Sequence, residues 1–232
     1  MSTLFMIRHG QASFGKENYD ELSDLGRRQS RILGKNFMSS GILLDAIYSG
    51  TLARQSETVR EFLSAYGSGG IKLPKILKTD AFNEHDSEGV LRGLIPVFIK
   101  ENPGFEKDVE RMLDDNRSFQ KVFEAVMLRW VSNDYDNPEL RKWEDFIFQV
   151  EQGIKNIMAN SDRGKNVALF TSGGPIAVAV RKALNLTNTD TIKVSWQVVN
   201  TSVSCFKYTK NRFMLSTFNE HAHFEKGLIT YR

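Results

Sequence analysis

Short apolar runs alternate with amphipathic segments along the first third of the chain. The continuous apolar stretch at 4–7 is typical of a strand that is buried on both faces, and 45–48 is expected to be a second short strand. The segments 22–38 and 52–66 repeat apolar residues at three- and four-residue spacing, which predicts helices, with Ser23 or Asp24 as the N-cap of the first. This alternation predicts an α/β fold, a three-layer α/β/α sandwich with a mostly parallel sheet.

The middle of the chain departs from this alternation. A third strand is expected over 75–82 and a loop over 83–93, followed by two long amphipathic helices at 119–131 and 143–157. Because these helices interrupt the strand and helix order, we place them in a helical insertion, or cap, over 90–160. The whole chain, 1–232, is then expected to form one domain.

The last third returns to the first pattern. A buried strand is expected at 167–170, and Gly173-Gly174-Pro175 begins a helix that runs to about Leu184, with the proline in a tolerated first-turn position. Two strand-like segments, 198–208 and 213–218, flank a Thr-Lys-Asn turn and predict a closing hairpin.

Composition narrows the function classes. The chain has 41% hydrophobic and 25% charged residues, and its 31 basic and 28 acidic residues are interleaved, which disfavours nucleic acid as a partner. The single cysteine, Cys205, excludes an intrachain disulfide and is expected to be a buried, inert thiol. No signal-peptide pattern precedes Arg8, and no run approaches the roughly 20 apolar residues of a membrane span. A cytoplasmic protein without membrane contact is therefore expected.

Arg8-His9-Gly10 follows the first predicted strand. Open α/β sheets bind ligands beyond the carboxyl ends of their strands, so a histidine here is a candidate for chemistry. The same segment is close to a phosphate-binding P-loop, but Glu17 stands where a P-loop has the Ser or Thr that holds Mg²⁺. Nucleotide hydrolysis is therefore disfavoured.

A second basic residue follows the second predicted strand. The run Ser49 to Thr58 places Arg54 in the first turns of a helix, where the guanidinium group and the helix N-terminus both favour phosphate. A surface ion pair between Arg54 and Glu57 or Glu61 is the alternative interpretation.

These motifs, in this order from Leu4 to the C-terminal hairpin, resemble the histidine phosphatase (phosphoglycerate mutase-like) superfamily, branch 1. The resemblance implies a phosphoglycerate mutase-like fold in which Arg8 and Arg54 bind phosphate, His9 is the nucleophile and Glu84 is the acid. Asp86 is a substitute for Glu84, because the spacing from Glu84 to Gly89 is one residue longer than in the family.

The implied reaction proceeds through a phosphohistidine. A neutral imidazole nitrogen attacks phosphorus while a backbone carbonyl holds the other ring nitrogen, and the arginines balance the developing charge. Water then hydrolyses the phosphohistidine, with a carboxylic acid first protonating the leaving oxygen and then helping to deprotonate water.

The chain departs from the family after the fourth predicted strand. The family has a histidine before the first glycine there, whereas this chain has Ser172 before Gly173. A hydroxyl is a neutral donor, and losing one transition-state donor typically lowers the rate about 10²- to 10³-fold. Backbone amides near Gly173 could offset part of that loss. Another histidine, from among His85, His221 and His223, is a less favoured replacement. Ser172 itself lacks the glycine two residues earlier that a nucleophile elbow needs.

The sequence therefore predicts a phosphomonoesterase of reduced turnover that acts on a small phosphorylated metabolite or phosphopeptide. The alternatives are a catalytically impaired phosphate-binding protein and a phosphoglycerate mutase-type phosphotransferase. The mutase is disfavoured because Gln11-Ala12-Ser13-Phe14-Gly15 lacks the family's Glu-Ser-x-Trp-Asn. No metal-ligand spacing is found, so neither a metal nor another cofactor is expected.

Overall fold

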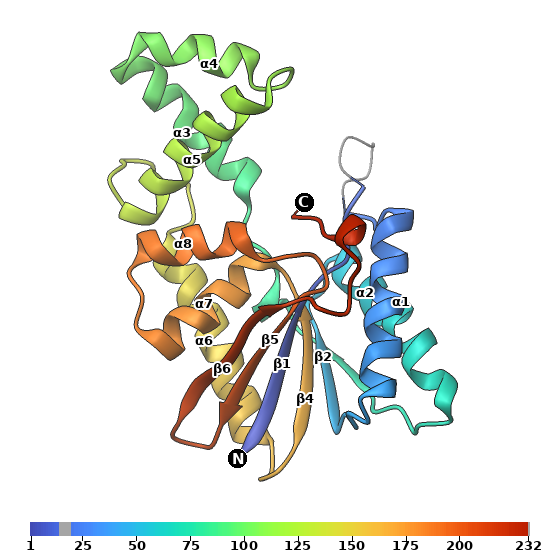
Figure 1. The fold of residues 1–232 in the computed structure, drawn as a ribbon. Helices are drawn as coiled ribbons and strands as arrows, with labels where there is room; N and C mark the ends of the chain where they lie inside the picture. The colour runs from blue at the N-terminus through green and yellow to red at the C-terminus, as the bar shows by residue number, and fades with distance from the viewer. Residues whose placement is uncertain (14–19, 232) are drawn as a thin grey trace.

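The computed structural model describes residues 1–13 and 20–231 and contains one mixed six-stranded sheet between helical layers (Figure 1). The strands run in the order β3-β2-β4-β1-β5-β6. Their bounds are β1 (Ser2–Arg8), β2 (Ala46–Ser49), β3 (Ile76–Lys78), β4 (Asn166–Thr171), β5 (Val203–Tyr208) and β6 (Phe213–Glu220). The expected three-layer α/β architecture with a closing hairpin is confirmed.

The register of the sheet brings the ends of three strands to one edge. β4 runs parallel to both β1 and β2, and its end pairs with the end of each. β5 runs antiparallel to β1 and continues into the hairpin with β6. The residues that directly follow β1, β2 and β4 therefore lie together at the carboxyl edge of the parallel strands, where such sheets bind ligands.

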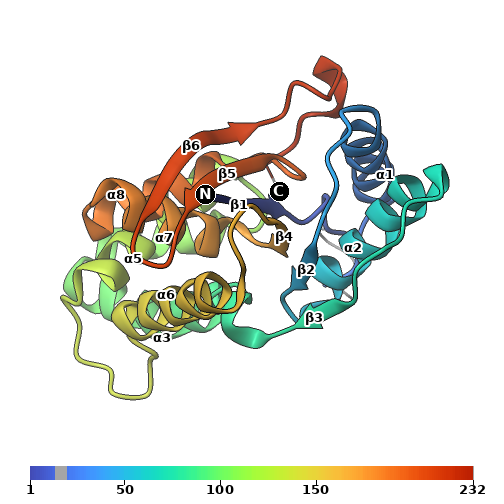
Figure 2. The ribbon, with the colours of Figure 1, turned by 90° about the horizontal axis from the view of Figure 1, so that it is seen from below.

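Helices cover both faces of the sheet (Figure 2). One face carries α1 (Asp24–Ser39) and α2 (Ala53–Tyr66), and the other carries α6 (Trp143–Asn160), α7 (Gly173–Leu184) and α8 (Asn188–Gln197). β1 contributes to both cores, because Leu4 and Met6 join one buried apolar cluster while Ile7 joins the other. A continuous apolar strand is what burial on both faces requires.

Between β3 and β4 the chain forms α3 (Ser87–Glu101), α4 (Glu106–Arg111), α5 (Asn116–Ser132) and then α6. α3, α4 and α5 extend beyond the end of the sheet at which β1 and β4 finish (Figure 1). The expected loop over 83–93 is wrong in its second half, since α3 already begins at Ser87. Asp86 is the N-cap and accepts a hydrogen bond from the Gly89 N–H at 2.9 Å. Gly89 and Gly93 suggested a loop, but the cap and the tertiary packing favour a helix.

Three further expectations need correction. β3 is shorter than 75–82 because the chain turns into a 3-10 helix over Asp80–Phe82, which buries Phe82. β5 begins at Val203 and not at 198, since Thr201 takes a left-handed conformation with φ 56°. Cys205 is partly buried, and this burial raises the pKa of its thiol, which keeps it protonated.

α4 and the polar helix α8 were not predicted, because neither has a strong apolar stripe. Among the described helices none is long and apolar enough to cross a membrane.

Candidate active site

His9 lies directly after β1, fixed by its backbone. Its N–H donates to the Thr171 carbonyl at 2.8 Å, and its carbonyl accepts a hydrogen bond from Asn200 Nδ2 at 3.1 Å. In the ring, Nδ1 lies 2.8 Å from the Gly10 carbonyl oxygen, and Nε2 accepts a hydrogen bond from Arg54 Nε at 3.2 Å. Nδ1 therefore carries the proton and Nε2 keeps its lone pair, as a nucleophilic imidazole requires.

The surroundings of His9 keep its imidazole neutral. The residue is 4% exposed, and burial is the main cause that lowers its pKa well below 6.5. The positive charges of Arg54 and Arg8 lower it further, while the hydrogen bond to Gly10 opposes them. The expected neutral ring, held at one nitrogen by a backbone carbonyl, is thus present in the structure.

Two arginines act on this ring from different elements. Arg54 stands in the first turn of α2, and its Nη1 donates to Asp20 Oδ1 at 2.7 Å. The second Asp20 oxygen accepts a hydrogen bond from the Ala53 N–H at 2.7 Å, so Asp20 bridges the helix N-terminus and the guanidinium group. Arg8, the last residue of β1, donates from Nη1 to the Val198 carbonyl.

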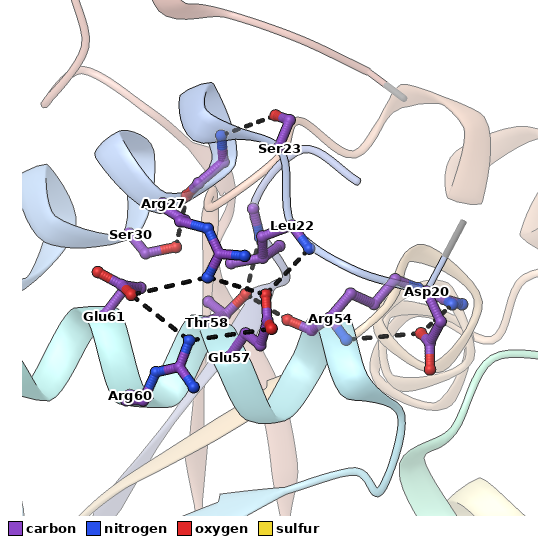
Figure 3. Close-up of polar contacts among 12 residues, drawn as sticks. Asp20, Leu22, Ser23, Arg27, Ser30, Arg54, Glu57, Thr58, Arg60 and Glu61 are labelled. Atoms are coloured by element: carbon purple, nitrogen blue, oxygen red, sulfur yellow. Dashed lines mark hydrogen bonds and ion pairs between the residues drawn. The ribbon is translucent and has the colours of Figure 1, made fainter. Parts of the chain in front are cut away.

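The alternative ion pair of Arg54 with Glu57 or Glu61 is not formed (Figure 3). Glu57 Oε2 instead accepts a hydrogen bond from the Leu22 N–H at 3.0 Å and contacts Arg27 Nη1 at 3.2 Å. Glu57 and Glu61 point from α2 toward α1, whereas Arg54 points toward Asp20. These acidic residues therefore join the two helices and leave Arg54 beside His9.

α2 also holds the loop that follows His9. Thr58 Oγ1 accepts a hydrogen bond from the Gly10 N–H at 3.0 Å and donates to the Arg54 carbonyl at 2.7 Å. Gly10 must be glycine, because a Cβ there would lie 2.4 Å from the Gly26 carbonyl oxygen of α1. The close approach of α1 and α2 thereby sets the positions of His9 and Arg54 together.

Ser172 lies after β4 as the N-cap of α7, with no exposed surface. Its Oγ accepts a hydrogen bond from Gln55 Nε2 at 2.9 Å, and the same nitrogen donates to the Phe82 carbonyl at 3.0 Å. Both hydrogens of the Gln55 amide are therefore used, whereas the Ser172 hydroxyl keeps its own hydrogen for an acceptor. Gly173 begins α7, and a Cβ there would lie 2.9 Å from the Ser195 carbonyl oxygen.

Glu84 reaches the same edge from the loop before α3. Its Oε2 accepts a hydrogen bond from the Gly174 N–H at 3.0 Å, and its Oε1 lies 2.8 Å from His85 Nδ1. Burial by itself raises the pKa of this carboxyl, but His85, the Gly174 N–H and Arg54 outweigh burial and hold the pKa at about 2. Glu84 is close enough to His9 for its charge to raise the pKa of that ring.

The order and geometry of these residues agree with one family. The family model of the histidine phosphatase superfamily (branch 1) matches residues 4–115 and 107–221. The chain belongs to this superfamily.

Sequence relatives include 2,3-bisphosphoglycerate-dependent phosphoglycerate mutases. The protein from Parvibaculum lavamentivorans is 32% identical over 110 residues, which cover 45% of this chain and 50% of that protein. The protein from Bartonella quintana is 32% identical over 98 residues, which cover 40% of this chain and 46% of that protein. The chain thus matches about half the length of these curated relatives.

Solved structures share the whole fold. Bacillus stearothermophilus YhfR superposes with a TM-score of 0.66 at 16% identity, covering 97% of this chain and 100% of that chain. The phosphoserine phosphatase of Entamoeba histolytica, solved with 3-phosphoglyceric acid, gives a TM-score of 0.64 at 17% identity and covers 96% of this chain and 99% of that chain.

The structure distinguishes between Glu84 and Asp86, the two candidates for the acid. Asp86 uses its carboxylate to cap α3, whereas Glu84 contacts the start of α7 beside Ser172. Glu84 is therefore the carboxyl group that the fold brings to His9.

Of the three histidines considered as replacements, His85 lies beside the site near Gly174, whereas His221 and His223 contact residues of β6. His85 pairs with Glu84, and His221 Nδ1 lies 2.6 Å from the Asn219 carbonyl oxygen. His223 is buried, its Nδ1 is 3.9 Å from Glu220, and burial lowers its pKa. The Gln55 amide occupies the space beside Ser172.

Several residues of the site were missed from the sequence. Gln55, Thr58, Asp20, Gly174 and Asn200 all hold a predicted site residue through one hydrogen bond or more. Gln55 and Thr58 could have been found from the sequence, because Gln55 directly follows Arg54 and Thr58 lies one helical turn after it. Asp20 and Asn200 had no such relation to a predicted site residue. Glu17, which argued against a P-loop, lies outside the described residues.

Proposed function

We propose that this histidine phosphatase is a phosphomonoesterase that works through phosphorylated His9. The observation that carries the proposal is the state of the His9 ring: Nδ1 is held by the Gly10 carbonyl, and the unprotonated Nε2 accepts a hydrogen bond from Arg54 Nε. A phosphate placed on Arg8 and Arg54 would take the Arg54 N–H and leave Nε2 directed at phosphorus.

The reaction has two steps. In the first, a bond forms between His9 Nε2 and phosphorus, the ester P–O bond breaks, and Glu84 gives the leaving oxygen a proton. In the second, water attacks phosphorus, the P–N bond breaks, and the carboxylate accepts the proton of that water. Inorganic phosphate and neutral His9 result. The negative charge of the bound phosphate favours the protonated form of Glu84 in the first step.

Reduced turnover follows from the corner that Ser172 occupies. The Ser172 hydroxyl gives a phosphate one neutral hydrogen bond, and Gly173 and Gly174 bring the N-terminus of α7 beside it. Charged donors form hydrogen bonds about twice as strong as neutral ones, so this corner stabilises the transition state less than a histidine would.

The substrate class in this proposal is a small phosphorylated metabolite or a phosphopeptide, and the cytoplasm is the proposed location. The region 90–160 acts as the cap of a single domain, since α3, α4 and α5 extend past the edge of the sheet that carries His9 (Figure 1). A phosphatase among the related structures supports the hydrolytic assignment.

The test is acid-quench trapping of the phosphoenzyme. The protein is incubated with p-nitrophenyl phosphate to measure turnover, and with a ³²P-labelled phosphoester to detect the covalent adduct. Both signals should disappear in His9→Ala and persist in His221→Gln, a matched histidine substitution whose ring contacts the Asn219 carbonyl. Binding of phosphate without any adduct would overturn the proposal in favour of a phosphate-binding protein.

The phosphotransferase is the second candidate, favoured by the phosphoglycerate mutases among the relatives. A mutase must pass the phosphoryl group to a second hydroxyl group before water does. Adding unlabelled 3-phosphoglycerate to the ³²P-labelled phosphoenzyme before the acid quench should therefore release labelled inorganic phosphate from a phosphatase and labelled bisphosphoglycerate from a mutase.

A further inference from the structure

His85 is almost buried beside Glu84, and neither proposed reaction step uses it. Its ring lies among three aromatic rings of the cap helices, with centroid distances of 5.0 Å to Trp130, 6.3 Å to Trp143 and 5.4 Å to Phe146. The side chain is 9% exposed, and Nδ1 lies 2.8 Å from Glu84 Oε1. The aromatic rings therefore hold the imidazole in place, with Nδ1 close to the Glu84 carboxylate.

Glu84 is consequently held from two sides. His85 contacts Oε1, while the Gly174 N–H donates to Oε2 from the first turn of α7. The fit is tight, because a Cβ on Gly174 would lie 2.1 Å from Glu84 Oε1 and 3.1 Å from His85 Nδ1. The packing of α5, α6 and α7 around Glu84 and His85 therefore holds the Glu84 carboxylate in a single position, beside the edge of the sheet that carries His9.

The acid step raises a question of proton supply. The pKa of Glu84 is about 2, so the carboxylate is ionised at neutral pH before substrate binds. His9 is neutral and must keep its Nδ1 proton to hold the Gly10 carbonyl, and the arginines do not deprotonate in proteins. Among the described residues, the imidazole of His85 contacts the Glu84 carboxylate.

We propose that His85 is a positioning and proton-sharing residue for Glu84. This inference rests on the proposed function. As the ester P–O bond breaks, the leaving oxygen takes a proton from Glu84, and Glu84 takes the Nδ1 proton of the His85 imidazolium. In the hydrolytic step, the proton from water returns through Glu84 to His85, so the pair ends each cycle as it began.

Solvent reaches the pair from the cap side. Glu84 and His85 both line a cavity of about 770 Å³ between the start of α3, the segment before α6 and the first turns of α6. The charged residues that line this cavity with them are Asp80, Asp86, Arg92, Glu139 and Arg141, and the charges that act on Glu84 from the catalytic side are His9 and Arg54. The charges of these three carboxylates and two arginines nearly cancel. The charged group within hydrogen-bond distance of His85 is Glu84.

The experiment compares two leaving groups. His85→Asn keeps an N–H near the position of Nδ1 but carries no proton that titrates. An alkyl ester such as O-phosphoserine needs a protonated leaving oxygen, whereas the p-nitrophenolate of p-nitrophenyl phosphate leaves without one. Loss of a general acid typically costs about 10²- to 10⁴-fold, so phosphoenzyme formation in His85→Asn should fall about 10²-fold with the alkyl ester. It should change little with p-nitrophenyl phosphate.

The control is Arg92→Gln, which changes the charge of the same cavity without touching Glu84 and should leave both rates unchanged. An equal loss on both esters would show that His85 only supports the fold and would overturn the proposal.

A second measurement keeps the failure of this inference separate from that of the proposed function. The ¹⁵N chemical shifts of the His85 ring, recorded at pH 7, report its proton without any turnover. They should change in Glu84→Gln, and an unchanged ring would overturn the proton-sharing pair. If the wild-type protein forms no phosphoenzyme with either ester, the proposed function fails and the catalytic role of His85 fails with it.

Discussion

Gln55 Nε2 donates a hydrogen bond to Ser172 Oγ at 2.9 Å, from the first turn of α2 to the N-cap of α7. Both residues are fully buried, and the same Gln55 nitrogen reaches the Phe82 carbonyl. The corner for which the family resemblance implied a second histidine thus contains a serine and a glutamine in the structure. These two residues are neutral at every pH, so this corner supplies hydrogen bonds without charge.

Restoring the histidine therefore requires space as well as the imidazole. Ser172→His alone should be destabilised by about 1–3 kcal/mol, because a larger side chain in a packed site collides with the Gln55 amide. The double variant Ser172→His, Gln55→Ala should relieve this collision. Its kcat with p-nitrophenyl phosphate should exceed that of the wild type by about 10-fold or more, since one transition-state donor is worth about 10²- to 10³-fold. A double variant no faster than Gln55→Ala would contradict this placement.

The depressed pKa of His9 makes a prediction for pH. Because this pKa lies well below 6.5 in the folded protein, phosphoenzyme formation should continue at pH values where an ordinary imidazole is protonated. Folding stability should respond in the opposite direction. As pH falls below about 6.5, the unfolded chain gains a proton that folded His9 does not, so stability decreases toward the folded pKa. Urea unfolding at pH 7.5 and 5.5 should show a smaller decrease for His9→Gln.

Gly174 tests the position of Glu84. In Gly174→Ala the new methyl group would lie 2.1 Å from Glu84 Oε1, so the carboxylate must move away from α7. Turnover of an alkyl phosphate should fall by about 10²-fold, the lower end of the usual contribution of a general acid. Gly227→Ala is the matched control, because nothing lies within 4 Å of its added Cβ. Equal activity in both variants would show that Glu84 has no part in the reaction.

Thr58 tests the coupling between α2 and the His9 loop. Thr58→Val removes the acceptor of the Gly10 N–H, and a buried donor without a partner costs about 1–3 kcal/mol. Both the melting temperature and the rate of phosphoenzyme formation should decrease, since the loop and Arg54 lose a shared contact. Thr58→Ser keeps the hydroxyl and should recover most of each. A Thr58→Val protein with unchanged rate would mean that the loop is held by other contacts.

Local pattern was sufficient where one segment determines its own structure. The side chains of β1 point in turn into the two apolar cores on either face of the sheet. Ser23 caps α1 by accepting a hydrogen bond from the Gly26 N–H. The pattern failed where local and tertiary preferences compete. The loop expected around Gly89 is helical from Ser87 onward, because Asp86 caps it and Val90 is buried in the core.

By itself, the sequence predicted the α/β class, a strand at 4–7 and the candidates His9 and Arg54, and the family resemblance added Glu84 and Ser172. These depend on residue type and on spacing along one segment. Only the tertiary structure decided their partners: Asp20 for Arg54, Gln55 for Ser172, and Gly174 for Glu84. These pairs are separated by 34, 117 and 90 positions. Whether such side chains meet depends on how the helices pack against the sheet, and no local pattern of apolar and polar residues records that packing.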